Sequence, residues 1–277
     1  MGGIFGAGGV VGWFQTLAAG LLPPRAFAPL KFAWARPARD WLNASLGLIY
    51  PELCQVCQLS RATAAEGFVC AKCRQRVLPV EPPFCQRCGL PFTGELTTQF
   101  ECGNCRDLDF HFSSARAAVV SQGVARDVIL RYKYQRALWF EPFLTGCLLR
   151  AAVPELTGKN VSLVVPVPLH PVKEREREFN QAHRLAAPLA AALGVPLNAR
   201  LLRRVSFTVT QTRLSRSARA QNMQGVFALR PGVRLQGQGV VLVDDVFTTG
   251  ATTNACAKML RAAGAAQVWV WTVARGV

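Results

Sequence analysis

Two adjacent carboxylates followed by a threonine-rich turn are the side chains of this sequence best suited to bind a ligand. The stretch Val240–Thr252 reads VVLVDDVFTTGAT, so a buried-looking apolar strand ends in Asp244 and Asp245. The turn that follows contains Thr248, Thr249, Gly250, Ala251 and Thr252. Paired carboxylates are costly unless they meet a cation or hydroxyl groups, and a helix N-terminus offers N–H groups to a phosphate. A sugar phosphate satisfies both, with Mg²⁺ able to bridge them. The alternative is an acidic turn that only caps a helix.

Eight of the ten cysteines form four pairs with the spacing C-x-x-C. The pairs are Cys54 and Cys57, Cys70 and Cys73, Cys85 and Cys88, and Cys102 and Cys105. Two such turns, brought together by a short hairpin, make a tetrahedron of sulfur atoms that favours Zn²⁺, with an iron–sulfur cluster as the alternative. The near-equal spacing predicts two zinc ribbons in series, and interleaved pairing is the other arrangement. Four thiolates leave no open coordination position, so we expect two structural zinc ions.

A second anion-binding segment is expected at Val164–Gln181, which reads VVPVPLHPVKEREREFNQ. A strand runs into a proline-rich turn, and the cations Lys173, Arg175 and Arg177 follow. Cationic side chains in a loop after a strand can clamp a diphosphate. Glutamates alternate with these cations, so pairing within the segment is the alternative interpretation.

The charge of the chain is strongly positive and unevenly spread. The net charge is +16 over 277 residues, and no Asp or Glu occurs between Glu178 and Asp244. Such a field favours phosphate ligands, nucleic acid or an acidic membrane surface, unless it is only a solvated basic face. Hydrophobic residues make up 51% of the sequence, which excludes a wholly disordered chain.

The elements that must position these residues alternate between strands and helices. We expect strands over 117–121, 162–167, 239–243 and 268–273, and helices over 124–134, 138–152, 181–193 and 251–263. This alternation predicts parallel crossovers and therefore an α/β fold. Three regions result: an irregular extension over 1–46, the cysteine region over 47–106 and the α/β domain over 115–277. The first 22 residues are glycine-rich and have no positive region before the apolar run, which disfavours a signal peptide and membrane insertion.

The motifs, taken in order, resemble those of the ComF (GntX-like) family. They comprise the cysteine ribbons, Tyr132-Lys133-Tyr134, the VPVPLH strand, the F-N-Q, the segment QTRLSRSARAQNMQGVF over 211–227 and the VVLVDDVFTTGAT loop. The resemblance covers about residues 47–275. It implies a type I phosphoribosyltransferase-like parallel sheet flanked by helices and preceded by a small zinc-ribbon domain. Glu178 is a departure, because the family commonly has Gly there.

The resemblance also implies a ligand, 5-phosphoribosyl 1-diphosphate (PRPP). Asp244 and Asp245 would bind its ribose hydroxyls, and the turn over 248–252 would wrap its 5-phosphate. ComF proteins are cytoplasmic, are associated with the uptake of single-stranded DNA in natural transformation, and resemble partners of a DNA-translocating helicase.

Two hypotheses follow from the resemblance. In the first, the chain is a PRPP-responsive accessory protein whose basic tract over 200–234 follows DNA phosphates. Phe179, Phe207 and Phe227 either stack on bases or belong to the core. In the second, the chain is an active phosphoribosyltransferase in which Asp244 and Asp245 are catalytic, Mg²⁺ stabilises the departing diphosphate, and the nitrogen acceptor is unidentified.

Overall fold

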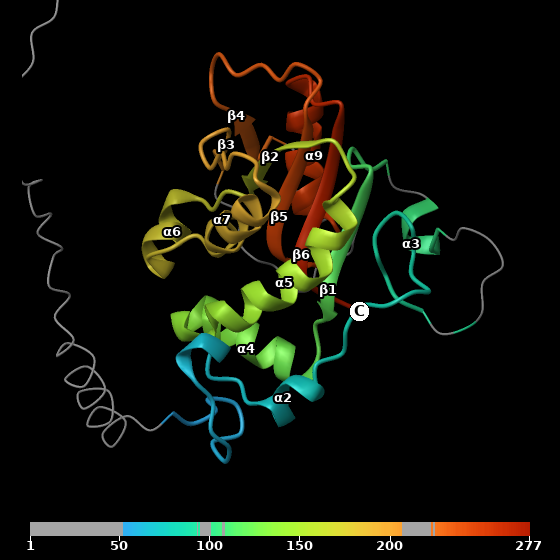
Figure 1. Cartoon of the computed structure of the whole chain (residues 1–277). Coiled ribbons are helices and arrows are strands. Elements are labelled where there is room, and N and C mark those ends of the chain that lie inside the picture. Colours follow the sequence, from blue (N-terminus) through green and yellow to red (C-terminus); the bar gives the residue numbers. More distant parts are fainter. Residues whose placement is uncertain (1–51, 93, 95–100, 107–108, 207–222, 224) are drawn as a thin grey trace, which may run out of the picture. The chain divides into compact units, whose positions relative to one another are not determined.

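The computed structural model describes residues 52–92, 94, 101–106, 109–206, 223 and 225–277 (Figure 1). The chain from Pro51 to Val277 forms one compact unit. The irregular extension expected over 1–46 lies outside the described residues. Among the residues that are described, no helix is long and apolar enough to cross a membrane.

A four-stranded parallel sheet is the centre of the fold. Its strands are β1 (Ser114–Val120), β2 (Val161–Pro166), β5 (Gly239–Phe247) and β6 (Gln267–Arg275), in the order β1-β6-β5-β2. All neighbouring strands run parallel, which confirms the predicted α/β class. The continuous apolar run over 240–243 is fully buried because helices cover both faces of the sheet.

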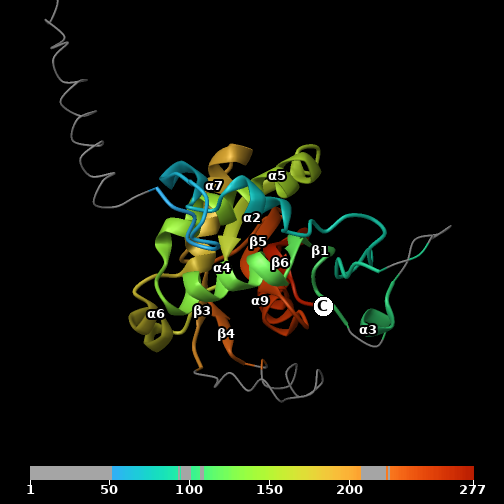
Figure 2. The same ribbon diagram turned by 90° about the horizontal axis from the view of Figure 1, so that it is seen from below.

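Helices pack on both faces (Figure 2). One face is covered by α4 (Gly123–Tyr134), α5 (Glu141–Leu156) and α7 (Gln181–Leu193), and the opposite face by α9 (Ala251–Ala262). Side chains of β5 alternate between the two cores: Val241 and Val243 pack under α5 and α7, and Val240 and Leu242 pack under α9. The carboxyl end of β5 is therefore held between two well-packed layers.

The two cysteine clusters join different cores. In the first cluster, Cys70 is the N-cap of α2 (Ala71–Gln75) and Cys73 lies within it, η1 (Ala64–Glu66) precedes them, and the cysteines pack with α4 and α5. The second cluster includes α3 (Gly103–Arg106) and packs with Phe110, Phe112 and α9. Each ribbon thus extends one hydrophobic layer of the α/β sheet.

Three parts of the chain differ from the sequence-based expectation. The cationic loop is a short helix, α6 (Pro171–Arg177), which begins with a proline at its first position, where no N–H is needed. A small antiparallel pair, β3 (Leu202–Arg204) and β4 (Phe227–Leu229), was not predicted, because three-residue strands carry too little alternation to detect. The helix expected over 138–152 is a 3₁₀ turn, η2 (Leu138–Phe140), followed by α5.

Candidate functional site

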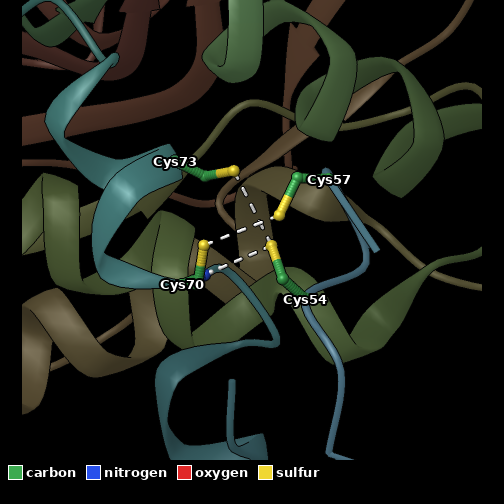
Figure 3. A group of neighbouring side chains, drawn as sticks. All are labelled: Cys54, Cys57, Cys70 and Cys73. Atoms are coloured by element: carbon green, nitrogen blue, oxygen red, sulfur yellow. Dashed lines mark hydrogen bonds between the residues drawn. The ribbon is translucent and has the colours of Figure 1, made fainter. Parts of the chain in front are cut away.

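Each cysteine cluster has the dimensions of a zinc tetrahedron. In the first cluster the Sγ atoms of Cys54 and Cys73, and those of Cys57 and Cys70, are 3.8 Å apart (Figure 3). The second cluster repeats this geometry, with Sγ separations of 3.8 Å for Cys85 and Cys105, 3.7 Å for Cys88 and Cys102, and 3.6 Å for Cys102 and Cys105. Four sulfurs at the Zn–S distance of about 2.3 Å are about 3.8 Å apart. Grouping is therefore sequential, as the spacing favoured, and not interleaved.

Backbone N–H groups favour the thiolate form at Cys54, Cys57 and Cys85, whereas burial raises the thiol pKa of Cys73, Cys102 and Cys105. The amide of Cys70 donates to the Sγ of Cys54, and the amide of Cys102 donates to the Sγ of Cys85, each at 3.3 Å. At Cys57 the backbone N–H groups of Leu59 and Ser60 lower the thiol pKa to about 6. Because zinc ligands must be deprotonated, these donors fit two structural zinc ions.

The carboxylate pair lies where β5 extends beyond the end of the neighbouring strand β2. Pairing of β5 with β2 ends at Val243, whereas pairing with β6 continues to Phe247 and Arg275. The strand is thus four residues longer than the predicted 239–243, and Asp244 and Asp245 sit beside the end of β2. Ligands of open α/β sheets bind beyond such strand ends.

Lys133 of α4 is the direct partner of Asp245. Its Nζ lies 2.5 Å from Oδ2 of Asp245, and the two side chains are only 16% and 6% exposed. The remaining oxygen, Oδ1, accepts the backbone N–H of Val246 at 2.8 Å. Within the described residues, Oδ2 accepts no hydrogen bond of good geometry. The Asp245 carboxylate is therefore held by the Lys133 ammonium on one oxygen and by a backbone N–H on the other.

Asp244 is half-buried and has a different electrostatic setting. Burial raises the pKa of its carboxyl to about 6, although the charges of Lys133, Arg177 and Arg204 oppose this shift. Burial together with the charge of Asp244 also raises the pKa of the Cys256 thiol on α9. Because neighbouring strand residues point to opposite faces, Asp244 is directed toward the α9 layer and Asp245 toward α4.

The threonine turn leads into α9 through a glycine in the left-handed region. Gly250 has φ of 83° and caps the helix, and a Cβ atom there would lie 2.6 Å from the ring of Phe247. The backbone N–H of Ala251 donates to Oγ1 of Thr249 at 3.4 Å. Thr248 is exposed, whereas Thr249 and Thr252 are half-buried. The turn therefore presents hydroxyls and the N-terminus of a three-turn helix at one place, which suits an anion.

A buried arginine ties this turn to the second cysteine cluster. Arg275 is 2% exposed, and its Nη1 donates to the carbonyl oxygens of Phe247 and Thr248 at 3.1 and 2.9 Å. Its Nε donates to the carbonyl oxygen of Cys88 at 3.1 Å, and its Nη2 lies 3.6 Å from the Sγ of Cys88. One guanidinium thus orients the turn against a metal-ligating residue.

The predicted cationic side chains are only partly brought to the carboxylates. Arg177 acts electrostatically on Asp244 and lies over the ring of Tyr134, 5.2 Å from its centroid. Lys173 is half-buried on the same face of α6, where the charge of Arg177 lowers its pKa further after burial. Arg175 is exposed.

The unusual Glu178 follows α6 with φ of 67°, and its carboxylate lies 2.7 Å from Arg136. The left-handed conformation explains why glycine suits this position.

Lys133, Arg204 and Arg275 were not predicted as site residues. Each is brought to the site by tertiary packing: Lys133 of α4 pairs with Asp245, the charge of Arg204 of β3 acts on Asp244, and Arg275 of β6 donates to the turn that follows the carboxylates. Lys133 was visible as part of the Tyr132-Lys133-Tyr134 motif, but its spacing implied no role. The other two residues carried no signal beyond their charge.

Comparisons with known proteins agree with this architecture. Residues 45–106 match a family described as a double zinc ribbon domain, and residues 182–276 match a phosphoribosyl transferase domain. Competence protein F of Haemophilus influenzae is 31% identical over 218 residues, or 76% of this chain and 92% of that protein. DNA utilization protein YhgH of Salmonella typhimurium is 31% identical over 234 residues, or 82% and 99%.

Among solved structures, an adenine phosphoribosyltransferase is similar over 52% of this chain and 74% of its own, with a TM-score of 0.34 and 13% identity. The family matches and the parallel sheet confirm the predicted fold, a phosphoribosyltransferase-like α/β sheet with an N-terminal double zinc ribbon.

Proposed function

The chain belongs to the ComF family, and from this membership and the geometry of the β5 end we propose that it binds PRPP and handles single-stranded DNA during DNA uptake. The observation that carries the proposal is the juxtaposition of the Asp244–Asp245 pair with a threonine turn that opens α9. The relatives named for competence and for DNA utilization support the DNA part.

The ribose of PRPP fits the carboxylate pair. Its two hydroxyls would donate to the carboxylates of Asp244 and Asp245, the second of which is held by the ion pair with Lys133. The 5-phosphate would accept from the turn over 248–252 and from the N-terminus of α9. The diphosphate would face Arg177 and Arg204, whose charges already act on Asp244.

Mg²⁺ fits this arrangement with one protein carboxylate. Asp245 is ion-paired with Lys133, so Asp244 is the carboxylate that remains for a cation. Mg²⁺ commonly binds through one or two carboxylates while keeping substrate oxygens and water as its other ligands. When bound, it would neutralise charge on the diphosphate.

Handling of single-stranded DNA requires a basic surface. The stretch without acidic residues between Glu178 and Asp244 supports such a surface. A cytoplasmic location and work beside a DNA-translocating helicase belong to the same proposal.

The second candidate function is phosphoribosyl transfer to a nitrogen acceptor. It is favoured by the Asp244 carboxylate, which would stabilise positive charge developing on the ribose.

Parallel assays separate the two candidates. Diphosphate release from PRPP is measured across nucleobases and simple amines, and gel shifts with single-stranded DNA are run on the same preparation. The accessory role predicts salt-sensitive DNA binding without turnover. Turnover that Asp244→Ala abolishes would instead establish the enzyme, and the absence of both activities would refute the proposal.

A further inference from the structure

A basic groove lies at the β2 edge of the sheet, beside the site described above. It has a volume of about 540 Å³ and is bounded by the turn after β2, the start of α7 and the strand β3. In Figure 1 the elements α6, α7 and β3 lie together on this side of the molecule. The side chains that matter for its chemistry are Phe179, His183, Arg184, Arg200, Arg203 and Arg204.

The charges in this groove are only partly compensated. Arg184 is paired with Glu141, and Glu174 is the one acidic residue of the lining. Arg200 and Arg203 are exposed, and no carboxylate of the described residues lies within ion-pairing distance of either. A concave surface with several cations of one sign concentrates positive potential and attracts phosphates.

We propose that this groove is where single-stranded nucleic acid binds, with Arg200 and Arg203 contacting consecutive phosphates. This inference rests on the proposed function in DNA handling and assigns it to a surface. A groove of this size admits one or two splayed nucleotides, whereas a duplex is too wide and stiff to enter it. Sequence-tolerant binding of single strands combines such a cationic track with aromatic side chains.

Phe179 provides an apolar surface inside the groove. It is half-buried, and its ring packs against that of Tyr132 with centroids 5.2 Å apart, so its position is fixed. Proline and leucine side chains from the turn after β2 line the same wall. A base that leaves water can therefore contact an ordered ring, which adds to the electrostatic attraction.

The groove lies near the carboxylate site. Arg204 lines the groove, and its charge acts on Asp244. A strand that follows the groove therefore brings its backbone next to the surface proposed to hold PRPP. This proximity favours nucleic acid over an unrelated polyanion, because nucleic acid, like PRPP, would present a sugar phosphate to the guanidinium group of Arg204.

The test is a binding titration of a fluorescein-labelled oligothymidylate, longer than the roughly 4–16 nucleotides that such sites cover. Fluorescence anisotropy is followed over a range of salt concentrations for the full-length protein. The variant Arg200→Ala/Arg203→Ala removes two cations of the groove. The control Arg76→Ala/Arg126→Ala removes two exposed cations that lie outside its lining. Thermal unfolding of both variants confirms that they fold.

We expect the groove variant to bind about tenfold more weakly or worse, with a salt slope smaller by about 1.4, since each phosphate contact on a single strand contributes about 0.7. The control should keep the wild-type slope, and Arg200→Lys/Arg203→Lys should keep most of the affinity. Wild-type binding that the groove variant retains, or that the control loses equally, would overturn the groove alone. A wild-type protein that binds no single-stranded DNA would overturn both the groove and the DNA part of the proposed function.

Discussion

Replacing Asp244 by asparagine should make the free protein more stable while it weakens ligand binding. The carboxylate is half-buried, and burial raises its pKa from the ordinary 3.8 to about 6. Asparagine keeps the Oδ1 atom that accepts the N–H of Asp245 at 2.9 Å, so the local backbone should not change. What the substitution removes is the cost of holding a charge in a poorly hydrated place.

The size and the pH dependence of the effect follow from the shifted pKa. One pKa unit corresponds to about 1.4 kcal/mol, so the full shift is worth about 3 kcal/mol. Because the carboxylate is partly exposed, we expect roughly 1–2 kcal/mol at neutral pH, or a Tm higher by roughly 2–6 °C. The folded-state pKa lies above that of the unfolded chain. The protonated Asp244 carboxyl therefore stabilises the folded wild type at low pH. This stabilisation is lost as the pH rises through about 6.

The assay is denaturant unfolding of wild type and Asp244→Asn at several pH values between about 5 and 8, with zinc present because its thiolate ligands become protonated in acid. The stability difference should grow with pH and level off above about pH 7. Asp127→Asn is the control, since Asp127 is exposed and, among the described residues, its ion pair is with Arg131 on its own helix, at 3.8 Å. An Asp244→Asn protein that is no more stable than wild type at pH 7, or a difference that does not vary with pH, would refute the reasoning.

Three further predictions concern the supports of the site. Lys133→Met leaves the buried Asp245 carboxylate unpaired and should cost about 3–5 kcal/mol of stability. Adding Asp245→Asn should restore most of that stability, which a double-mutant cycle of unfolding free energies measures. Additive losses in the two single variants and the double variant would contradict this prediction. A lysine at position 275 cannot span the carbonyl groups of Cys88 and Thr248 that the Arg275 guanidinium joins. In Arg275→Lys, calorimetry should therefore show PRPP binding about tenfold more weakly, while metal analysis still finds both zinc ions. Unchanged PRPP affinity would contradict this prediction. Metal analysis of the wild type should give two Zn²⁺ per chain. Cys85→Ser should lose one of these ions and lower the affinity for PRPP. A single Zn²⁺ in the wild type would refute the presence of two zinc sites.

The sequence predicted the elements that have strong local signals. The run over 240–243 was recognisable as a buried strand, and the helix predicted over 181–193 agrees with α7, which is framed by Asn180 as N-cap and Gly194 in the left-handed conformation. The cysteine spacing predicted the correct grouping, because a C-x-x-C turn fixes its own geometry. In these cases the information lay within a few residues of the element itself.

The sequence did not predict features that depend on tertiary packing. The end of β5 could not be found, because it is set by pairing with β6 up to Arg275. The ion pair of Lys133 with Asp245 joins residues from a helix and a strand that only the fold brings together. The cationic segment before Glu178 looked like a loop, because seven residues are too few for a clear helical period.

PRPP binding at the end of β5 is the property on which the proposed function rests. Isothermal titration calorimetry of the zinc-loaded protein with PRPP and Mg²⁺ should show one saturable site per chain. Asp244→Asn should weaken binding roughly tenfold or more, because a charged hydrogen bond to the ribose is lost. Asp127→Asn should bind like wild type. Absence of saturable binding, or equal affinity in Asp244→Asn and wild type, would contradict the assignment of this site.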